Sequence, residues 1–421
     1  MFYRLLYNLL IHLFSPLLLA LLYWPKKGKP GFGKRWPEHL GFVSPTNGKR
    51  PVWLHAVSVG EMVAATPLIR QLKAEHPNLP ILVTTTTRTG ADQAAKLSDL
   101  IEHRYAPLDF PWAVALFLRR VQPRTLLIME TELWPNWLTA CGRRKLPVMV
   151  LNARLSARSA DRYRKFHGIF RLLSKNITHI ACQYRDDADR FAGLGVPRNR
   201  LSTTGSIKFD IDYDETVREQ GKMLRAQLGS QRPVWIAAST HEGEDEQLLE
   251  AHQTLLPRFP DALLILVPRH PQRFDQVAAL VQKQGLTLHR RTQSEPKAGT
   301  QVYLGDTMGE LPLMLAAADV AFVGGSLIER GGHNLLEPAA LGKPVLTGPS
   351  TFNFSDITRE LLQAKGASIV ADSQELANTL AQLFEHEPQR NAMGKAALKV
   401  VEANQGALAR TLAAINTQLP R

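Results

Sequence analysis

The sequence predicts an α/β protein made of two doubly wound, parallel-sheet domains, preceded by an N-terminal membrane-anchoring helix. Short apolar segments alternate with helical segments along most of the chain, which is the pattern of parallel sheets covered by helices. A chain of 421 residues is also longer than one hydrophobic core usually serves. We therefore expect a membrane anchor at residues 1–24, a first domain at 25–208 and a second domain at 209–421, whose last helix crosses back to the first.

Residues 1–24 are mostly leucine and aromatic residues, which favours contact with lipid. The apolar run is marginal for the roughly 20 residues of a full span. No small-residue cleavage site follows it, so an uncleaved anchor fits better than a signal peptide. The segment could span the bilayer, lie in its surface or be an ordinary buried helix. Lysines that would face anionic headgroups on the cytoplasmic side follow directly: Lys26, Lys27 and Lys29.

The charge balance indicates an anionic partner. The formal net charge is +13, which favours binding to nucleic acid, to a membrane surface or to an acidic substrate. No nucleic-acid fold signature accompanies the basic clusters and aromatic residues are not interleaved with them, so we expect no nucleic-acid partner. The two cysteines cannot build a disulfide framework or a zinc site by themselves, which makes a reducing cytoplasm the default compartment.

Five apolar strands are expected in the first domain, at 52–56, 80–84, 124–129, 147–151 and 177–182. In a doubly wound sheet the functional groups gather where the strands end. The turns that follow these strands are therefore the places to expect functional side chains.

Two of these turns carry carboxylates. Glu61 ends the turn Ser58-Val59-Gly60-Glu61 and falls in the first turn of a helix. There it can either complement the helix dipole or point into the crevice as a general base. Glu130 and Glu132 follow the third strand, and acids clustered in this way are costly unless they pair with a cation or a ligand. They could also be solvated or cap the next helix.

Arginines follow the fourth strand. Arg154 and Arg158 begin a run that continues with Arg162 and Arg164. Guanidinium groups bind phosphate through paired hydrogen bonds, although a solvated basic helix face is the usual alternative. Together with the apolar N-terminus, the run predicts a site for a phosphorylated lipid, with Arg154 and Arg158 as the candidate phosphate contacts.

Four strands are expected in the second domain, at 233–238, 262–267, 301–304 and 319–323, before a further strand that starts at Val345. Because the first domain shows the same alternation, the chain consists of two similar αβ halves. We expect the strand ends of both halves to surround one interdomain cleft, where the substrates would bind.

A glycine-rich turn lies between the strand that ends at Val323 and a short helix that closes at Gly342. Glycines let the backbone approach a ligand, and a helix start offers unpaired N–H groups to an anion. Such a unit can hold a nucleotide phosphate, and Glu329 and Glu337 on either side of it could bind ribose hydroxyls. The alternative is a structural crossover whose glycines only close a tight turn. The glycines are Gly324, Gly325, Gly331 and Gly332.

Seven motifs together resemble one enzyme family, the 3-deoxy-D-manno-octulosonic acid (Kdo) transferases of Gram-negative lipopolysaccharide assembly. The resemblance runs from the anchor to the C-terminal helix, and several motifs are long enough to be specific. The motifs are Ser58-Val59-Gly60-Glu61, Glu130-Thr131-Glu132-Leu133-Trp134-Pro135, Asn152-Ala153-Arg154-Leu155-Ser156, Thr204-Gly205-Ser206-Ile207-Lys208-Phe209-Asp210, Pro268-Arg269-His270-Pro271, Gly305-Asp306-Thr307-Met308-Gly309-Glu310 and the stretch 323–345.

The resemblance implies a GT-B fold, in which a Rossmann-like acceptor domain and a Rossmann-like CMP-sugar domain face a cleft. It implies an enzyme on the cytoplasmic face of the inner membrane that transfers Kdo from CMP-Kdo to lipid IVA, a lipid A precursor, with inversion at the anomeric carbon. By motif, Glu61 resembles the general base for the acceptor hydroxyl, and Glu130 resembles a second catalytic carboxylate. The residues that resemble CMP contacts are Pro268, Arg269, Met308, Gly309, Glu310, Asn334, Leu335, Leu336 and Glu337.

Neither a metal nor a cofactor is expected besides the donor, because Arg269 and helix N-termini can stabilise the leaving CMP without a divalent ion. Two alternatives stay open at this point. A different GT-B glycosyltransferase would use a UDP-sugar on a lipid-linked intermediate. A membrane-tethered basic protein would hold anionic lipid without catalysis.

Overall fold

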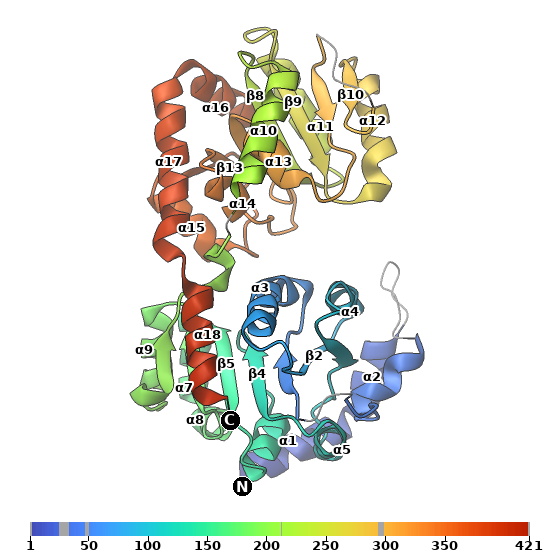
Figure 1. The fold of residues 1–421 in the computed structure, drawn as a ribbon, viewed down its shortest axis with the longest axis vertical. Coiled ribbons are helices and arrows are strands. Elements are labelled where there is room, and N and C mark those ends of the chain that lie inside the picture. The colour runs from blue at the N-terminus through green and yellow to red at the C-terminus, as the bar shows by residue number, and fades with distance from the viewer. Residues whose placement is uncertain (1, 25–32, 47–49, 212, 294–298, 420–421) are drawn as a thin grey trace. The chain divides into compact units, whose positions relative to one another are not determined.

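The chain forms two compact units, each built on one parallel sheet (Figure 1). The N-terminal unit holds Met1–Lys208 together with Gly406–Arg421, and the C-terminal unit holds Phe209–Gln405. Helices cover both faces of each sheet, so the prediction of two doubly wound parallel sheets is confirmed. The computed structural model describes residues 2–24, 33–46, 50–211, 213–293 and 299–419.

The N-terminal sheet has seven parallel strands in the order β3-β2-β1-β4-β5-β6-β7. The chain runs outward from β1 to β3 and then continues from β4 in the other direction, so the topological switch point lies between β1 and β4. The turns after these two strands, which carry Glu61 and Glu130, are therefore neighbours. The strands are β1 (Val52–His55), β2 (Ile81–Thr85), β3 (Glu102–Tyr105), β4 (Thr125–Met129), β5 (Val148–Ala153), β6 (His179–Cys182) and β7 (Leu201–Thr203).

Alternate residues of these strands fill two apolar cores, one on each face of the sheet. Trp53 and Ile128 belong to the first core, whereas Leu54 and Leu127 belong to the second. This alternation follows from the two-residue period of a strand. The helices of the unit are α3 (Val59–Glu75), α4 (Arg88–Ala95), α5 (Pro111–Val121), α6 (Pro135–Arg143), α7 (Ala157–Lys165), α8 (His167–Ser174) and α9 (Arg185–Gly193), with the 3-10 helices η1 (Gly33–Leu40), η2 (Arg198–Arg200) and η3 (Ile207–Phe209).

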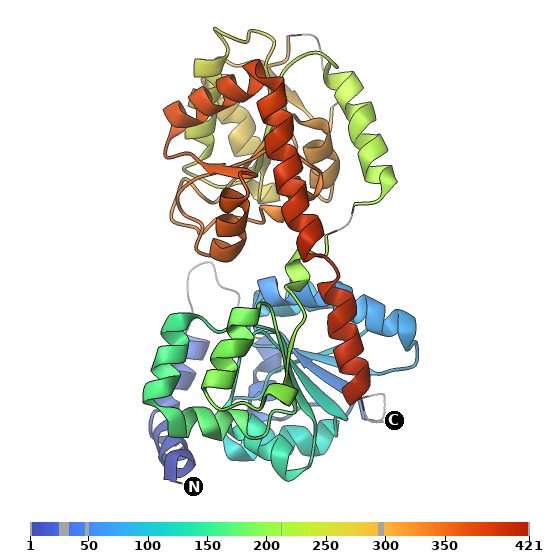
Figure 2. The same ribbon diagram turned by 90° about the vertical axis from the view of Figure 1, so that its left-hand side faces the viewer.

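The helix α18 (Ala407–Gln418) belongs to the N-terminal unit although it follows the C-terminal unit in the chain. It runs beside β5 (Figure 2) and buries Leu412 and Ile415 in the second core. Arg410 Nε also donates a hydrogen bond to the carbonyl oxygen of Thr204 at 2.8 Å. The core of the N-terminal unit is therefore completed by a segment that is distant in the sequence.

The C-terminal sheet has the strand order β10-β11-β9-β8-β12-β13-β14, again all parallel. The carboxyl ends of β11, β9, β8 and β12 are adjacent, which brings the turns after these strands to one edge. The strands are β8 (Val234–Thr240), β9 (Leu263–Pro268), β10 (Leu288–Arg290), β11 (Val302–Leu304), β12 (Val320–Val323), β13 (Val345–Thr347) and β14 (Ala367–Ile369).

Apolar clusters lie on both faces of the C-terminal sheet, and Trp235 and Ile236 of β8 belong to different clusters. The glycine-rich stretch leads into the short helix α14, as the sequence predicts. The helices of this unit are α10 (Glu215–Leu228), α11 (Asp245–Leu255), α12 (Phe274–Lys283), α13 (Leu311–Ala317), α14 (Leu336–Ala340), α15 (Ser355–Gln363), α16 (Ser373–Glu385) and α17 (Glu387–Asn404), with the 3-10 helix η4 (Pro271–Arg273).

The N-terminal segment forms two short helices instead of the single anchoring helix that we expected. The helices α1 (Phe2–Leu13) and α2 (Ser15–Tyr23) are separated at Phe14. Across the described ranges, no helix combines the length and the apolar character needed to cross a bilayer. Both helices leave leucines exposed, which rules out the alternative of an ordinary buried helix. These leucines are Leu5, Leu6, Leu9, Leu10, Leu13 and Leu17.

The other side of α1 is fixed on the N-terminal unit. Asn136 Nδ2 donates hydrogen bonds to Asn8 Oδ1 at 2.7 Å and to the carbonyl oxygen of Asp109 at 2.6 Å. Tyr3 covers Gly168 so closely that a Cβ atom at Gly168 would lie 2.2 Å from Tyr3 Cε2. The helix therefore has one docked side and one leucine-rich side.

Candidate functional site

Glu61 lies at the carboxyl edge of the N-terminal sheet, in the first turn of α3. The N-cap Ser58 accepts a hydrogen bond from the Glu61 N–H at 3.4 Å. The Glu61 carboxylate accepts hydrogen bonds from the Val57 N–H at 2.7 Å and from the Ser58 hydroxyl at 3.3 Å. This arrangement is a variant of the capping box that a Ser-x-x-Glu sequence favours, in which Glu61 accepts from the N–H of Val57 instead of that of the N-cap Ser58. The side chain is consequently held in one position at the end of β1.

The environment of Glu61 also changes its acidity. The residue is only 8% exposed. Burial raises the pKa of its carboxyl group to about 7, and the negative charges of Glu130 and Glu132 act in the same direction. The hydrogen bond from Val57 opposes this rise. A carboxylate with a pKa near neutral pH can both accept and release a proton under physiological conditions, which a general base requires.

Glu130 is paired with a cation rather than solvated. Its carboxylate lies 3.2 Å from Lys208 Nζ, in η3. Its backbone has a φ of 56°, in the left-handed region that non-glycine residues seldom occupy. Burial and the charge of Glu130 raise the pKa of Glu132. The predicted acid cluster therefore consists of Glu130, which is paired with Lys208, and Glu132, whose pKa is raised.

Lys208 was included in a motif but received no role from the sequence. Its position is set by the segment before it, because the Ile207 N–H donates a hydrogen bond to the side-chain oxygen of Asn152 at 3.2 Å. Asn152 is fully buried and has a φ of 53° at the end of β5. Asn152 and Lys208 are more than fifty residues apart, so their spacing in the sequence does not predict that they belong to one site. Only their presence in the motifs that resemble the Kdo transferases indicated a role for them.

The predicted phosphate contacts lie on the neighbouring turn. Arg154 and Arg158 are exposed, at the end of β5 and in the first turn of α7. The Thr131 hydroxyl donates a hydrogen bond to the carbonyl oxygen of Arg154 at 2.5 Å, and it accepts one from the Arg154 N–H at 3.3 Å. The structure thus brings Glu61, Glu130 and the Arg154 backbone to one edge of the N-terminal sheet.

In the C-terminal unit, the glycine-rich turn is organised by a carboxylate that sequence analysis missed. Glu244 is fully buried. Its Oε2 accepts from the N–H groups of Gly325 at 2.7 Å and His241 at 3.1 Å, and its Oε1 accepts from those of Ser326 at 2.9 Å and Leu327 at 3.0 Å. Three consecutive amides of the turn are therefore occupied by the protein itself.

The glycine amides of this turn are thus not open to a phosphate, whereas anion binding at the start of α14 stays a prediction. The N–H of Gly331 donates to Ser350 Oγ and that of Gly332 to the carbonyl oxygen of Gly325. Glycine is required here for conformation, since Gly325 has a φ of 72° and Gly331 a φ of 83°. The glycines close a tight turn, as the structural alternative proposed. An anion must be held by other groups at this edge.

Arg269 is such a group, and its positive charge acts on the nearby Glu337. Arg269 is exposed directly after β9, and its N–H donates to the carbonyl oxygen of Thr240 at 3.0 Å. Burial raises the pKa of Glu337, which also accepts a hydrogen bond from Asn334 Nδ2 at 3.4 Å. The positive charge of Arg269 opposes that rise, so the two residues interact electrostatically. Leu335 and Leu336, both predicted CMP contacts, are fully buried, and the Leu336 N–H donates to Asn334 Oδ1 at 3.2 Å.

The turn after β11 presents a different surface. Met308 is 62% exposed and Gly309 has a φ of 87°. The Glu310 carboxylate accepts hydrogen bonds from Arg291 at 2.9 and 3.1 Å and from the Thr307 hydroxyl at 2.5 Å. Arg291 lowers the pKa of Glu310, so this carboxylate is ionised and fixed.

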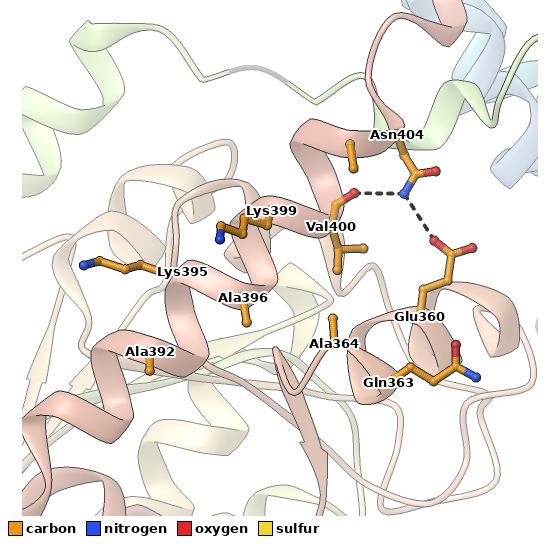
Figure 3. Close-up of a pocket in the computed structure, with 10 residues that line it drawn as sticks. Glu360, Gln363, Ala364, Ala392, Lys395, Ala396, Lys399, Val400 and Asn404 are labelled. Carbon is orange, nitrogen blue, oxygen red and sulfur yellow. Dashed lines mark hydrogen bonds between the residues drawn. The ribbon is translucent and has the colours of Figure 1, made fainter.

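A separate cavity of about 650 Å³ lies between α15 and α17 (Figure 3). It is lined by alanines, by Lys395 and Lys399, and by Glu360, which accepts a hydrogen bond from Asn404 at 3.3 Å. All of its lining residues come from these two helices and the adjoining Ala364, and none comes from the strand ends described above. We therefore place the candidate site at the sheet edges and not in this cavity.

Comparison with known proteins identifies the family. Residues 34–211 match the family model described as 3-deoxy-D-manno-octulosonic-acid transferase (kdotransferase), and residues 239–400 match that of the glycosyl transferases group 1. The 3-deoxy-D-manno-octulosonic acid transferase of Haemophilus influenzae is 41% identical over 424 residues, which cover 100% of this chain and 99% of that protein. The chain belongs to the Kdo transferase family. It is thus a Kdo glycosyltransferase of lipopolysaccharide biosynthesis, and both alternatives left open by the sequence are set aside.

Other Kdo transferases are similar over most of their length. The 3-deoxy-D-manno-octulosonic acid transferase of Bordetella pertussis is 39% identical, with 90% of each chain covered. The solved C-terminal CMP-Kdo binding domain of WaaA from Acinetobacter baumannii is 38% identical, covers 45% of this chain and 100% of its own, and has a TM-score of 0.43. HepE from Anabaena, solved with UDP, is 15% identical with a TM-score of 0.56, covering 88% of this chain and 99% of its own. The fold is thus GT-B-like, with two parallel-sheet α/β domains.

Proposed function

We propose that this Kdo transferase moves Kdo from CMP-Kdo to lipid IVA with inversion at the anomeric carbon, and that Glu61 is the general base. The observation that carries the proposal is the position and acidity of Glu61. The carboxylate is held by the Val57 N–H at the end of β1, and burial raises its pKa to about 7. A base of this strength can take a proton from a sugar hydroxyl as the hydroxyl attacks.

In the proposed step, the acceptor hydroxyl oxygen forms a bond to the anomeric carbon of Kdo, and Glu61 takes the hydroxyl proton. The bond from that carbon to the phosphate oxygen breaks, and CMP leaves with the bonding electrons. Glu130, held by Lys208 at 3.2 Å, would support the transition state beside Glu61. A charge that is fixed in advance stabilises a transition state without reorganisation.

The donor is proposed to bind the C-terminal unit through its CMP group. Arg269 would neutralise charge on the leaving phosphate, so the reaction needs no divalent ion. Met308 and Gly309 would offer an exposed side chain and an open backbone turn, whereas Leu335 and Leu336, also proposed contacts, are fully buried in the structure. The further proposed contacts are Pro268, Glu310, Asn334 and Glu337.

The acceptor is proposed to approach from a membrane surface. Arg154 and Arg158 are exposed and would bind the phosphates of lipid IVA. The exposed leucines of α1 and α2 would enter the headgroup region, with the helices lying in the surface of the inner leaflet. This would place the enzyme on the cytoplasmic face of the inner membrane. Lys26, Lys27 and Lys29, expected to face the headgroups, lie outside the described residues.

A transfer assay tests the mechanism. Purified wild-type enzyme and Glu61→Gln would be given CMP-Kdo and lipid IVA with EDTA present, and the product mass would be measured. Glutamine can still accept the Val57 hydrogen bond, so this change removes the base while keeping the cap. We expect full wild-type activity in EDTA and a loss of about two decades or more in the variant. Glu75→Gln, an exposed change on the same helix, is the control.

The outcomes separate the parts of the proposal. The mass of the product counts the Kdo units that are added. A wild-type enzyme that makes no product would refute lipid IVA as the acceptor. An active Glu61→Gln variant would leave Glu61 with only its capping role, and activity abolished by EDTA would refute metal independence.

A further inference from the structure

Three histidines meet at the carboxyl edge of the C-terminal sheet, and none has been given a role above. His241 follows β8, His270 follows β9, and His333 comes from the glycine-rich stretch. The Nε2 atoms of His241 and His333 are 2.8 Å apart, and their rings are nearly parallel, at 11°. The ring of His270 stands edge-on to that of His241, with centroids 5.4 Å apart. We call His241 and His333 the imidazole pair.

The imidazole pair is neutral. A hydrogen bond between two Nε2 atoms requires one of them to donate a proton and the other to accept it, so both rings cannot be protonated on these atoms. Burial lowers the pKa of each histidine to about 4, and neighbouring positive charges act in the same direction. At neutral pH the pair therefore adds no charge and keeps one ring N–H, on an Nδ1 atom, outside the shared hydrogen bond.

Two positive charges that act on the pair belong to exposed arginines, of which Arg269 also acts on Glu337. Within the described residues, neither Arg269 nor Arg330 forms an ion pair with a carboxylate, and both are exposed. Arg273, the third cation of this edge, is instead paired with the buried Asp245. Glu244 accepts the His241 N–H and three further backbone N–H groups, so its oxygens are already occupied. This edge therefore presents two arginines that form no ion pair in the described part of the chain, and it is suited to an anion.

We propose that the imidazole pair and Arg330 form the subsite for the carboxylate of the donor sugar. This inference rests on the proposed function, in which the donor is CMP-Kdo. In a nucleotide-activated 2-keto sugar acid, the carboxylate and the phosphoester oxygen are attached to the same carbon. If Arg269 takes the phosphate, the carboxylate must lie among the groups that adjoin Arg269. Among the groups that adjoin Arg269, the histidines and Arg330 suit a carboxylate, whereas the acidic Glu337 does not.

The subsite would select the donor. A nucleotide sugar without the carboxylate would leave the Arg330 guanidinium and the free imidazole N–H without a partner when the donor is bound, which is costly. The nucleotide itself would bind through other residues, and so the two parts of the donor make separable contributions. That separability makes the inference testable.

The test compares His333→Ala with the wild-type enzyme. Two constants would be measured: KM for CMP-Kdo, and the inhibition constant of CMP as a competitor. We expect KM to rise by about tenfold or more, the order expected for a lost hydrogen bond to a charged group, while the constant for CMP stays within about twofold. His333→Gln, which retains an N–H near the Nε2 position, should recover part of the loss. His386→Ala, an exposed change in the same unit, should alter neither constant.

Two results would overturn the inference. An equal rise in both constants would assign the pair to the phosphate or to support of the glycine-rich turn, and a lower melting temperature would accompany the second case. Unchanged constants would show that the pair does not contact the donor. Both results require a wild-type enzyme that uses CMP-Kdo, so they differ from failure of the proposed function, in which the wild type itself is inactive.

Discussion

Thr131 and Arg154 are hydrogen-bonded to each other in both directions. The Thr131 hydroxyl donates to the Arg154 carbonyl oxygen at 2.5 Å and accepts from the Arg154 N–H at 3.3 Å. One hydroxyl group therefore joins the turn after β4, which carries Glu130, to the turn after β5, which begins the basic segment. In the proposed reaction, this hydroxyl therefore joins the turn that holds the catalytic carboxylate to the turn that holds the acceptor phosphates.

Removing this hydroxyl should misplace the acceptor. Thr131→Val keeps the shape of the side chain and abolishes both hydrogen bonds, so we expect kcat/KM for lipid IVA to fall by about tenfold. Thr131→Ser retains the hydroxyl and should keep most of the activity. Steady-state transfer kinetics at saturating CMP-Kdo would measure the effect. If Val and Ser variants lose activity equally, the methyl group matters and the hydrogen bonds do not.

The pKa of Glu61 sets an expected pH dependence of activity. A general base must be ionised in the free enzyme, and burial raises the pKa of this carboxyl group to about 7. We therefore expect kcat/KM to fall about tenfold for each pH unit below about pH 7. The profile of Glu61→Gln should lose this limb and keep a low, flat rate. A wild-type profile that is flat down to pH 5 would contradict the assignment.

The same shift predicts that Glu61 destabilises the folded protein at alkaline pH. Its pKa rises from 4.5 to about 7 on folding, so the folded state binds the proton more tightly. Stability from this group is full below about pH 4.5 and is lost as the pH rises through 7, by about 3 kcal/mol in total. Glu61→Gln should therefore increase the free energy of unfolding by about 1–3 kcal/mol at pH 8 and change it little at pH 4.5. Urea unfolding at both pH values measures this, with Glu75→Gln as control. A less stable variant at pH 8 would show that the cap outweighs the buried charge.

Glu244 should determine the shape of the glycine-rich turn. In Glu244→Gln an amide NH₂ group would replace one of the oxygens that accept backbone N–H groups. We expect a loss of about 3 kcal/mol in stability of the C-terminal unit, together with weaker CMP binding, because His241 and Leu327 depend on the same carboxylate. Urea unfolding and titration calorimetry with CMP would test this. The adjacent exposed Glu242→Gln should behave as wild type, and equal behaviour of the two variants would contradict the role given to Glu244.

Adding a methyl group at Gly168 should disrupt the packing of Tyr3 on this residue. In Gly168→Ala the new Cβ would lie 2.2 Å from the Tyr3 ring, so α1 must shift or detach, at a cost of about 1–3 kcal/mol. Hydrogen exchange of residues 2–13 should become faster. Gly193→Ala is the matched control, because a Cβ there meets no atom within 4 Å. A second change, Tyr3→Ala, should restore slow exchange; if it does not, the overlap is not the cause.

The predictions of the fold succeeded where strands are buried on both faces. Segments such as β1 and β9 are continuous apolar runs, and only a central parallel strand accounts for such runs of four to six residues. The strands at the sheet edges were missed. β3 has the sequence Glu-His-Arg-Tyr and β10 the sequence Leu-His-Arg, so neither carries an apolar run. These two segments become strands because they pair with β2 and β11, and the local sequence does not predict this pairing.

The candidate site was predictable where its geometry is local. Ser58 and Glu61 are three residues apart, and the hydrogen bonds between them follow from that spacing alone. Glu244 lies more than eighty residues before the amides that it binds, and Lys208 lies far along the chain from Glu130. Such pairs are set by strand order, which the local pattern does not specify. The N-terminal leucines likewise revealed an apolar segment but not the break at Phe14, which divides it into two helices.

The docking of α18 has a consequence for biosynthesis. Leu412 and Ile415 fill part of the core beneath the N-terminal sheet, yet the ribosome makes them only after all of the C-terminal unit. Until then the N-terminal sheet has an uncovered apolar strip and the leucines of α1 are already exposed. The N-terminal unit therefore keeps apolar surface exposed while the whole C-terminal unit is being synthesised, and its core can close only afterwards.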